Sequence, residues 1–260
     1  MLPKPKKSLG QNFLVGANLN KKIVEACRIK NDETVIEIGP GKGALTGLIA
    51  EKAKYTYAVE IDKELSERLC MNFIGNTKVK IILADFLKID LNRYMPCGVK
   101  TKIIGNIPYY ITTPIIEKLL KHSERISSAY LTVQKEYARR ICAEPGCKEY
   151  GSLSCFVRYY AKPKIEFYIK SGSFYPKPKV DSALISLQIH SKPPVELNDR
   201  ERFFTLIRSA FAQKRKTLKN NLKSVLPQQT ISSFLEKTGL GPKARAEELS
   251  LQNFADLANL

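Results

Sequence analysis

The chain has 260 residues and 43% of them are hydrophobic, so it can bury a sizeable core and is not a disordered basic tail. Its 43 Lys and Arg outnumber its 25 Asp and Glu, which gives a formal net charge of +18. An excess of this size favours a polyanionic partner, most often a nucleic acid.

Short apolar runs alternate with amphipathic stretches through the first half of the chain. In order, the pattern predicts a strand at 34–38, a helix at 44–52, a strand at 57–61, a helix at 63–73, strands at 79–84 and 102–105, a helix at 112–121 and a strand at 129–133. Strands separated by helices of this length indicate βαβ units, and hence an α/β fold whose parallel sheet is covered on both faces.

The pattern changes after Ala161. Strands are expected at 165–169 and 183–189, on either side of a loop rich in Pro and Lys at 174–179. These two strands predict an antiparallel edge added to the parallel sheet.

From Arg200 onward only helical periodicity remains. The preceding stretch 191–194 contains adjacent prolines, which end both helices and strands. We therefore expect two domains, an α/β domain over residues 1–190 and a small all-helical domain over residues 195–260.

Basic residues gather in three places, and three clusters together favour binding over an ordinary solvated surface. The clusters are Lys4, Lys6 and Lys7; Lys135, Arg139 and Arg140; and Lys214, Arg215, Lys216 and Lys219.

Six cysteines and two histidines show neither zinc-ligand nor disulfide spacing. We expect no metal and reduced, mostly buried thiols. No apolar signal segment follows the N-terminal Met-Leu-Pro-Lys-Pro-Lys-Lys, and no run reaches membrane-spanning length. These features predict a cytoplasmic protein without a membrane partner.

Polar groups follow the ends of the predicted strands. The first strand runs into a turn that contains Gly39 and Gly41, where glycine lets the backbone approach a ligand and adopt positive φ. Glu60 closes the second strand about 20 residues later, where it could hold ribose hydroxyls. Asp85 closes the third strand and could accept a hydrogen bond from an adenine amine, and Asn106 closes the fourth. Four such strand ends on one edge of a parallel sheet predict a ligand crevice.

The charge before the glycine turn distinguishes between ligands. The turn also fits a dinucleotide fingerprint, but Glu37 would repel phosphates and suit a ligand with a positive charge. S-adenosylmethionine carries a sulfonium, an ammonium, an adenine and a ribose. It fits these residues better than NAD does.

The stretch Asn106-Ile107-Pro108-Tyr109 suits the grip of an exocyclic amine on a flipped-out nucleobase. The side-chain oxygen of Asn106 and the carbonyl of Ile107 or Pro108 could accept the amine hydrogens, which would localise the nitrogen lone pair. Tyr109 could stack on the base and offset the cost of unstacking it. A strand that ends in a Pro-containing turn is the alternative interpretation of the tetrapeptide.

Seven segments in register resemble the ribosomal RNA adenine dimethyltransferase family, which modifies two adjacent adenosines near the 3′ end of small-subunit rRNA. They are 7–14, 37–43, 59–62, 84–85, 105–109, 174–182 and 211–218. The resemblance runs nearly end to end and implies a Rossmann-like, S-adenosylmethionine-dependent methyltransferase sheet with a helical C-terminal domain that binds rRNA.

The resemblance also implies roles for particular residues. The residues that would contact S-adenosylmethionine are Asn12, Leu14, Gly39, Glu60, Asp85 and Asn106, with the segment 7–14 closing over the cofactor. Asn106, Pro108 and Tyr109 would grip the adenine, and Phe174 would form a second aromatic wall. The expected partner is the small-subunit rRNA within a precursor of the 30S subunit, bound by a monomer.

Ile107 and Tyr110 depart from the ribosomal branch, in which leucine and a small polar residue are usual. Isoleucine is typical of macrolide-resistance methyltransferases that act on large-subunit rRNA, whereas segments 174–182 and 211–218 favour the small subunit. A ribosome-assembly checkpoint factor and a DNA adenine methyltransferase are further alternatives. A dehydrogenase is the weakest, because no histidine is near to assist hydride transfer.

Overall fold

The computed structural model describes residues 5–260, so Lys4 of the first basic cluster lies outside the described residues. Contacts divide the chain into two compact units. The first runs up to Ala138 and resumes over Lys162–Ile189, and the second comprises Arg139–Ala161 and His190–Leu260. The stretch Arg139–Ala161 thus groups with the C-terminal helices. The linker at 191–194 gives no sign that this earlier stretch belongs to the second unit.

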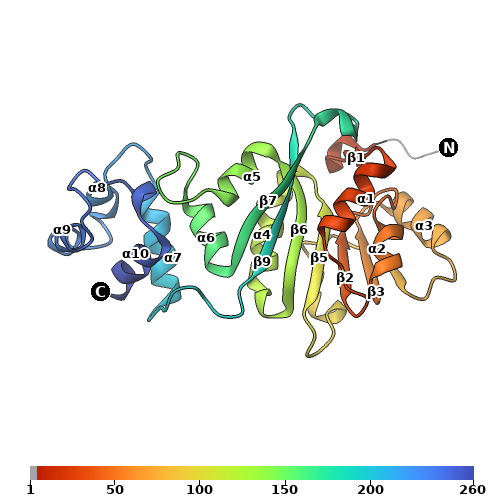
Figure 1. The fold of residues 1–260 in the computed structure, drawn as a ribbon, viewed down its shortest axis with the longest axis horizontal. Helices are drawn as coiled ribbons and strands as arrows, with labels where there is room; N and C mark the ends of the chain where they lie inside the picture. The colour runs from red at the N-terminus through yellow and green to blue at the C-terminus, as the bar shows by residue number, and fades with distance from the viewer. Residues whose placement is uncertain (1–4) are drawn as a thin grey trace. The chain divides into compact units, whose positions relative to one another are not determined.

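A seven-stranded sheet forms the first unit, with strand order β4-β3-β2-β5-β6-β9-β7 (Figure 1). The strands are β2 (Thr34–Ile38), β3 (Tyr55–Glu60), β4 (Val79–Leu83), β5 (Thr101–Asn106), β6 (Ile126–Gln134), β7 (Ala161–Ile169) and β9 (Ser182–Ile189). Strands β2 to β6 pair in parallel, and β9 pairs antiparallel to β6. The predicted α/β class, with a parallel sheet and an antiparallel edge, is confirmed.

The sheet has a switch point between β2 and β5. From β2 the chain builds outward through β3 and β4, and then returns to place β5 on the other side of β2. All five residues of β2 are buried, as expected for a strand covered on both faces. A parallel sheet of this kind holds its ligand outside the carboxyl ends of the strands, where the order reverses.

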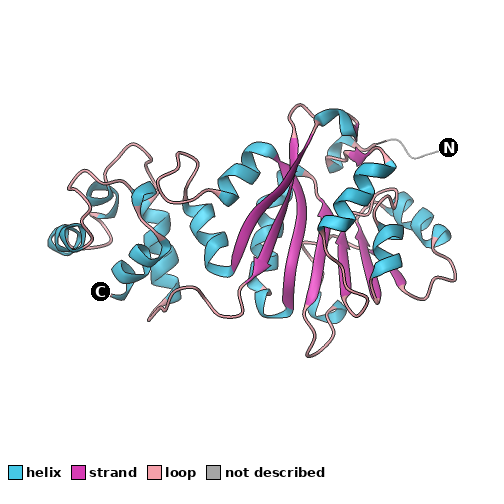
Figure 2. Ribbon diagram, viewed as in Figure 1, coloured by secondary structure: helices cyan, strands magenta, loops and turns pink. Residues whose placement is uncertain are grey.

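Helices cover both faces of this sheet (Figure 2). They are α1 (Ala17–Ala26), α2 (Thr46–Lys52), α3 (Lys63–Asn72) and α4 (Thr112–Lys121), with single turns at η1 (Lys7–Leu9), η2 (Leu91–Tyr94), η3 (Tyr109–Ile111), η4 (Ser123–Arg125) and η5 (Ser171–Ser173). Helix α5 (Lys135–Cys142) follows β6 and contains the boundary between the two units. Ile23 of α1 and Ile49 of α2 pack with Val35 of β2 and Ile104 of β5 in one apolar cluster. This cluster holds β2 and β5 in place, and so fixes the positions of their carboxyl ends.

A second, two-stranded sheet pairs the N-terminal segment with the Pro-Lys-rich loop. Strand β1 (Phe13–Leu14) lies antiparallel to β8 (Phe174–Tyr175), with Phe13 opposite Tyr175 and Leu14 opposite Phe174. The N–H of Val15 donates to the carbonyl of Ser173 at 2.9 Å, which extends this pairing by one residue.

The second unit is helical apart from its loops. Its helices are α6 (Ser152–Tyr160), α7 (Arg200–Ala210), α8 (Leu218–Leu222), α9 (Gln228–Lys237) and α10 (Leu251–Asn259), with a single turn at η6 (Ala246–Glu248). Asp199 caps α7 by accepting the N–H groups of Glu201 and Arg202, which satisfies donors that a helix start leaves unpaired. Tyr159, Phe203 and other aromatic residues of α6 and α7 fill the core.

Two of the six cysteines, Cys27 and Cys155, are buried, and three are exposed; the exposed ones are Cys70, Cys97 and Cys147. The expectation of mostly buried thiols was therefore wrong, because Cys70 lies on the outer face of α3 and the other two lie in loops. Within residues 5–260, no helix is long and apolar enough to cross a membrane. The same residues bring no three His, Cys, Asp or Glu side chains together as a metal site.

Candidate functional site

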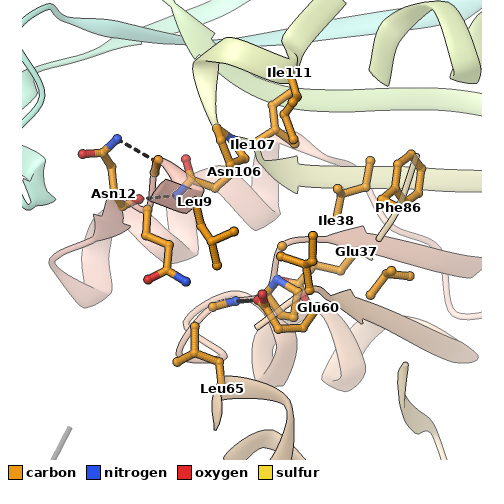
Figure 3. A pocket seen from close by; sticks show the side chains of 18 of the residues that line it. Leu9, Asn12, Glu37, Ile38, Glu60, Leu65, Phe86, Asn106, Ile107 and Ile111 are labelled. Carbon is orange, nitrogen blue, oxygen red and sulfur yellow. Dashed lines mark hydrogen bonds between the residues drawn. The ribbon is translucent and has the colours of Figure 1, made fainter. Parts of the chain in front are cut away.

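A cavity of about 290 Å³ opens at the carboxyl ends of β2, β3, β4 and β5, at the switch point of the sheet (Figure 3). Residues from five parts of the chain line it: 9–14, 37–42 with 44–45, 59–61 with 65, 84–87 and 106–111. The predicted residues that the structure brings to this cavity are Asn12, Leu14, Gly39, Gly41, Glu60, Asp85, Asn106, Pro108 and Tyr109. Phe174 is not among its lining residues.

Glu60 is held in place by backbone groups of the glycine turn and of the next helix start. Its Oε2 accepts the N–H of Gly41 at 2.9 Å, and its Oε1 accepts the N–H of Asp62 at 2.9 Å. Gly41 has φ +59°, and a β-carbon there would lie 3.0 Å from the ring of Phe13, so only glycine fits. Burial raises the pKa of Glu60, and the fixed carboxylate faces a ligand site rather than bulk water.

Glu37 lies beneath the glycine turn with only 2% of its surface exposed. Its Oε2 is buried without a hydrogen-bond partner. Burial raises its pKa to about 7; the nearby Thr46 hydroxyl lowers this pKa in part, and the negative charge of Glu60 makes a smaller contribution that raises it. An unpaired carboxyl oxygen at a cavity wall is costly unless a ligand supplies a donor or a positive charge.

The lining of the cavity is acidic although the chain is strongly basic. Among residues 5–260, its carboxyl groups are those of Glu37, Glu60 and Asp85, and its one basic residue is Lys42. The Lys42 ammonium lies 4.9 Å above the ring of Phe13. Three carboxylates against one ammonium favour a cationic ligand over a phosphate.

Asp85 lies in the loop after β4, and helix α4 holds this loop in place. Its Oδ1 accepts the N–H of Leu87 at 2.9 Å. From α4, the Lys118 ammonium donates to the carbonyls of Phe86, Leu87 and Ile89 at 2.9, 3.0 and 2.5 Å. This ammonium therefore fixes the loop that forms one wall of the cavity.

The N-terminal segment crosses the mouth of the cavity and is tied to its floor. Nδ2 of Asn106 donates to the backbone carbonyl of Asn12 at 2.9 Å, as Figure 3 shows. This bond uses the donor side of the Asn106 amide and leaves its oxygen as an acceptor. Farther along the segment, Nε2 of Gln11 donates to Oδ2 of Asp62 at 3.0 Å.

The remaining residues of the tetrapeptide form a rigid turn. Pro108 leads into η3, and its carbonyl accepts the N–H of Ile111 at 3.2 Å, which favours the Ile107 carbonyl as the second acceptor for an amine. The Tyr109 hydroxyl lies 2.6 Å from Oγ of Ser182 in β9. Tyr109, which lines the cavity, is thereby anchored at the tip of its side chain.

Phe174 has a different surrounding from the one expected. It is 3% exposed and packs in the apolar cluster of α1, α2 and the sheet. Pairing with Leu14 places it on the core side of β8, since neighbouring residues of a strand point to opposite faces. The structure therefore does not bring Phe174 to the cavity wall, and Tyr175 is the exposed residue of this pair.

Sequence reasoning missed three residues that support the site. Asp62 follows Glu60 and caps α3, and an Asp before a helix signals this cap. Ser182 ends the Pro-Lys-rich loop, and Lys118 is a basic residue late in a helix. Nothing in the sequence pattern marks the contacts that the last two make.

Two solved structures share this fold. The chain matches a crystal structure of the 23S rRNA methyltransferase ErmE with a TM-score of 0.78 and 26% identity, over 95% of this chain and 98% of that one. It matches a dimethyladenosine transferase from Plasmodium falciparum with a TM-score of 0.77 and 26% identity, over 94% and 95%. Together with the cavity at the switch point, these matches define a Rossmann-like RNA methyltransferase.

The family follows from the sequence comparisons. A family model described as ribosomal RNA adenine dimethylase matches residues 3–260, and the chain belongs to this family. It is 42% identical to a ribosomal RNA small subunit methyltransferase A from Clostridium botulinum, over 97% of this chain and 92% of that protein. It is 43% identical to the protein of the same name from Geobacillus thermodenitrificans, over 98% and 90%. The enzyme is thus an rRNA adenine dimethyltransferase.

Proposed function

We propose that this enzyme uses S-adenosylmethionine to dimethylate the N6 amines of two adjacent adenosines in the 3′-terminal hairpin of small-subunit rRNA. The observation that carries the proposal is the acidic cavity with Asn106 in its lining, in a chain of net charge +18. We further propose that it acts as a cytoplasmic monomer on a precursor of the 30S subunit and contributes to the biogenesis of that subunit.

The residues of the cavity fit S-adenosylmethionine. The buried, unpaired Oε2 of Glu37 suits the positively charged methionine end of the cofactor. Glu60 would hold the ribose hydroxyls, and Asp85 the adenine amine. Asn12, Leu14, Gly39 and Gly41 would contact the cofactor from the N-terminal segment and the glycine turn. When bound, the cofactor supplies a methyl group on a positively charged sulfur.

The chain contributes positioning rather than acid or base chemistry. The Asn106 oxygen and the Ile107 carbonyl would accept the two hydrogens of the adenine amine and direct its lone pair toward the methyl group. Tyr109 would stack on the base, with Pro108 fixing the turn. After one transfer, the amine keeps a single hydrogen, so the grip must hold while the amine rotates for the second transfer. The proton lost by the methylated amine passes to water.

The names of the two bacterial relatives support the small-subunit substrate. The likeness to ErmE, together with Ile107 in the tetrapeptide, supports large-subunit rRNA as the second candidate. The higher identity of the bacterial relatives, 42% and 43% against 26%, favours the first.

The deciding experiment supplies purified protein with tritiated S-adenosylmethionine and small ribosomal subunits that lack the modification, followed by nuclease digestion. Label in dimethyladenosine from small-subunit rRNA is the expected result. Label only in large-subunit rRNA, offered in a parallel reaction, would contradict the proposed substrate. Tight subunit binding with no transfer would instead favour an assembly checkpoint factor.

A further inference from the structure

Tyr110 and Tyr175 are the most exposed aromatic side chains within residues 5–260, with exposed fractions of 65% and 61%. Single exposed aromatic residues are ordinary on protein surfaces. These two, however, both lie against residues 10–13 of the N-terminal segment, which line the cavity. Their shared location points to one function.

Tyr110 lies at the mouth of the cavity beside the predicted adenine grip. It lines the cavity, and a β-carbon on Gly10 would lie 3.0 Å from its Cε1 atom, so its ring rests on the N-terminal segment. The hydroxyl of the neighbouring Tyr109 is anchored to Ser182, whereas most of the Tyr110 ring is in solvent. Of the two neighbouring tyrosines that line the cavity, Tyr109 is thus fixed by a hydrogen bond and Tyr110 is exposed at the rim.

Tyr175 contacts the same segment through the two-stranded sheet of β1 and β8. It lies opposite Phe13, and directly opposed residues of an antiparallel pair share a face. Tyr175 therefore lies on the same face of this small sheet as Phe13, which lines the cavity. The exposed residues Lys177 and Lys179 follow it. An exposed aromatic ring followed by basic residues suits a single-stranded nucleic acid, whose bases stack while its phosphates are neutralised.

We infer that Tyr110 and Tyr175 stack on the unpaired nucleotides on either side of the adenosine that enters the cavity. The inference rests on the proposed function and adds the contacts that select a single-stranded RNA segment. An adenosine that leaves its stack exposes the faces of both neighbouring bases. Exposed tyrosine rings at the rim can cover those faces and restore the lost stacking.

The test compares Tyr110→Ala, Tyr110→Phe, Tyr175→Ala and Tyr175→Phe with wild type on small subunits that lack the modification, at saturating S-adenosylmethionine. Each Ala variant should raise the KM for subunits about tenfold, equivalent to about 1.4 kcal/mol. Each Phe variant should retain the wild-type KM, since the ring suffices for stacking. Tyr55→Ala is the matched control. Tyr55 is exposed, and as the first residue of β3 it lies at the amino end of that strand, whereas the cavity lies at the carboxyl ends.

Calorimetric titration with S-adenosylmethionine provides the second readout, and unchanged affinity is expected in all variants. Ala variants with a wild-type KM for subunits would overturn the inference. A matching loss of cofactor affinity would also overturn it, because the rings would then only hold the N-terminal segment in place. Absence of methyl transfer by the wild-type protein is a distinct result, which overturns the proposed function and the inference together.

Discussion

Lys6 and Asp62 form an ion pair that ties the N-terminal segment to the start of α3. Nζ of Lys6 lies 2.7 Å from Oδ1 of Asp62, whose side chain is 2% exposed. The N–H of Asp62 in turn donates to Glu60. Burial opposes ionisation of Asp62, but hydrogen bonds from Lys6 and Gln11 outweigh it and lower the pKa of this carboxyl. Asp62 therefore links the N-terminal segment to Glu60.

Asp62→Asn should weaken S-adenosylmethionine binding about tenfold, because it removes one charge-assisted hydrogen bond and disturbs a second. Calorimetric titration measures the change. A group with a lowered pKa contributes above its ordinary value of 3.8 and loses its contribution as pH falls below it, so the difference should persist at neutral pH. Glu67→Gln, which breaks an exposed ion pair with Lys63 at 3.8 Å, should bind as wild type does. Equal affinities of Asp62→Asn and wild type would contradict the link.

Glu37 should make cofactor binding dependent on pH. Between its ordinary pKa of 4.5 and about 7 the folded protein retains a proton that the unfolded chain releases, so the stability contributed by this group falls as pH rises across that window. A cationic ligand favours the ionised carboxylate. Binding below pH 7 should therefore release a proton, and affinity should rise as pH passes through about 7.

Titration calorimetry in buffers of different ionisation enthalpy counts the protons released on binding of S-adenosylmethionine. Glu37→Gln should abolish both the proton release and the pH dependence. Proton release that persists in this variant would assign the titrating group elsewhere.

Asn106→Ala should lower turnover by about 10²-fold or more, since it removes an oriented hydrogen-bonding group at the reacting atom. Cofactor affinity should fall much less, through loss of the 2.9 Å bond to the Asn12 carbonyl. Steady-state kinetics on subunits and calorimetry with S-adenosylmethionine separate the two effects. Asn12→Ala retains the backbone carbonyl and should leave turnover nearly unchanged. Equal losses of turnover and affinity in Asn106→Ala would refute the role of its oxygen.

Lys118→Met should destabilise the cavity wall, because three carbonyl oxygens lose their donor. The expected cost is about 2 kcal/mol, which lowers the Tm by several degrees and weakens cofactor binding. Thermal unfolding with and without S-adenosylmethionine measures both effects. Lys121→Met alters an exposed residue of the same helix and serves as the control. A Lys118→Met protein with wild-type cofactor affinity would show that the loop holds its shape unaided.

Lys214→Glu combined with Arg215→Glu should weaken RNA binding and reduce the slope of log Kd against log salt by about 2. Both residues are exposed and lie beside other basic residues of the second unit. Filter binding to small subunits at several salt concentrations measures the slope. Lys52→Glu with Lys54→Glu changes the net charge equally and is the control. An identical slope in the two double variants would indicate that only net charge matters.

The sequence predicted the elements whose local signals are strong. Strand 34–38 and helix 112–121 agree with β2 and α4 at both ends. The apolar run of β2 ends at a glycine, and Pro114 marks the first turn of α4. Helix α6 was missed, since its Phe and Tyr residues favour strands locally and become helical by packing in an aromatic core. Strands β1 and β8 have two residues each, so long-range pairing alone defines them.

The same distinction applies to the site. Gly39, Glu60, Asp85 and Asn106 could be placed together because the carboxyl ends of parallel strands share an edge. The surroundings of Phe174 could not be predicted, because they depend on its register with Leu14. The bonds of Lys118 to a distant loop likewise depend on tertiary packing that leaves no periodic signal.

Strand β9 is the last strand of the chain, yet it lies inside the sheet between β6 and β7. During synthesis, β6 is complete well before β9 has been made. Until then, the edge of β6 that will pair with β9 has free N–H and C=O groups. Strand β7 is also made earlier but joins the sheet only through β9. The nascent catalytic unit therefore has an open edge until residue 189 leaves the ribosome, and a chain that stops short of this point exposes a surface prone to aggregation.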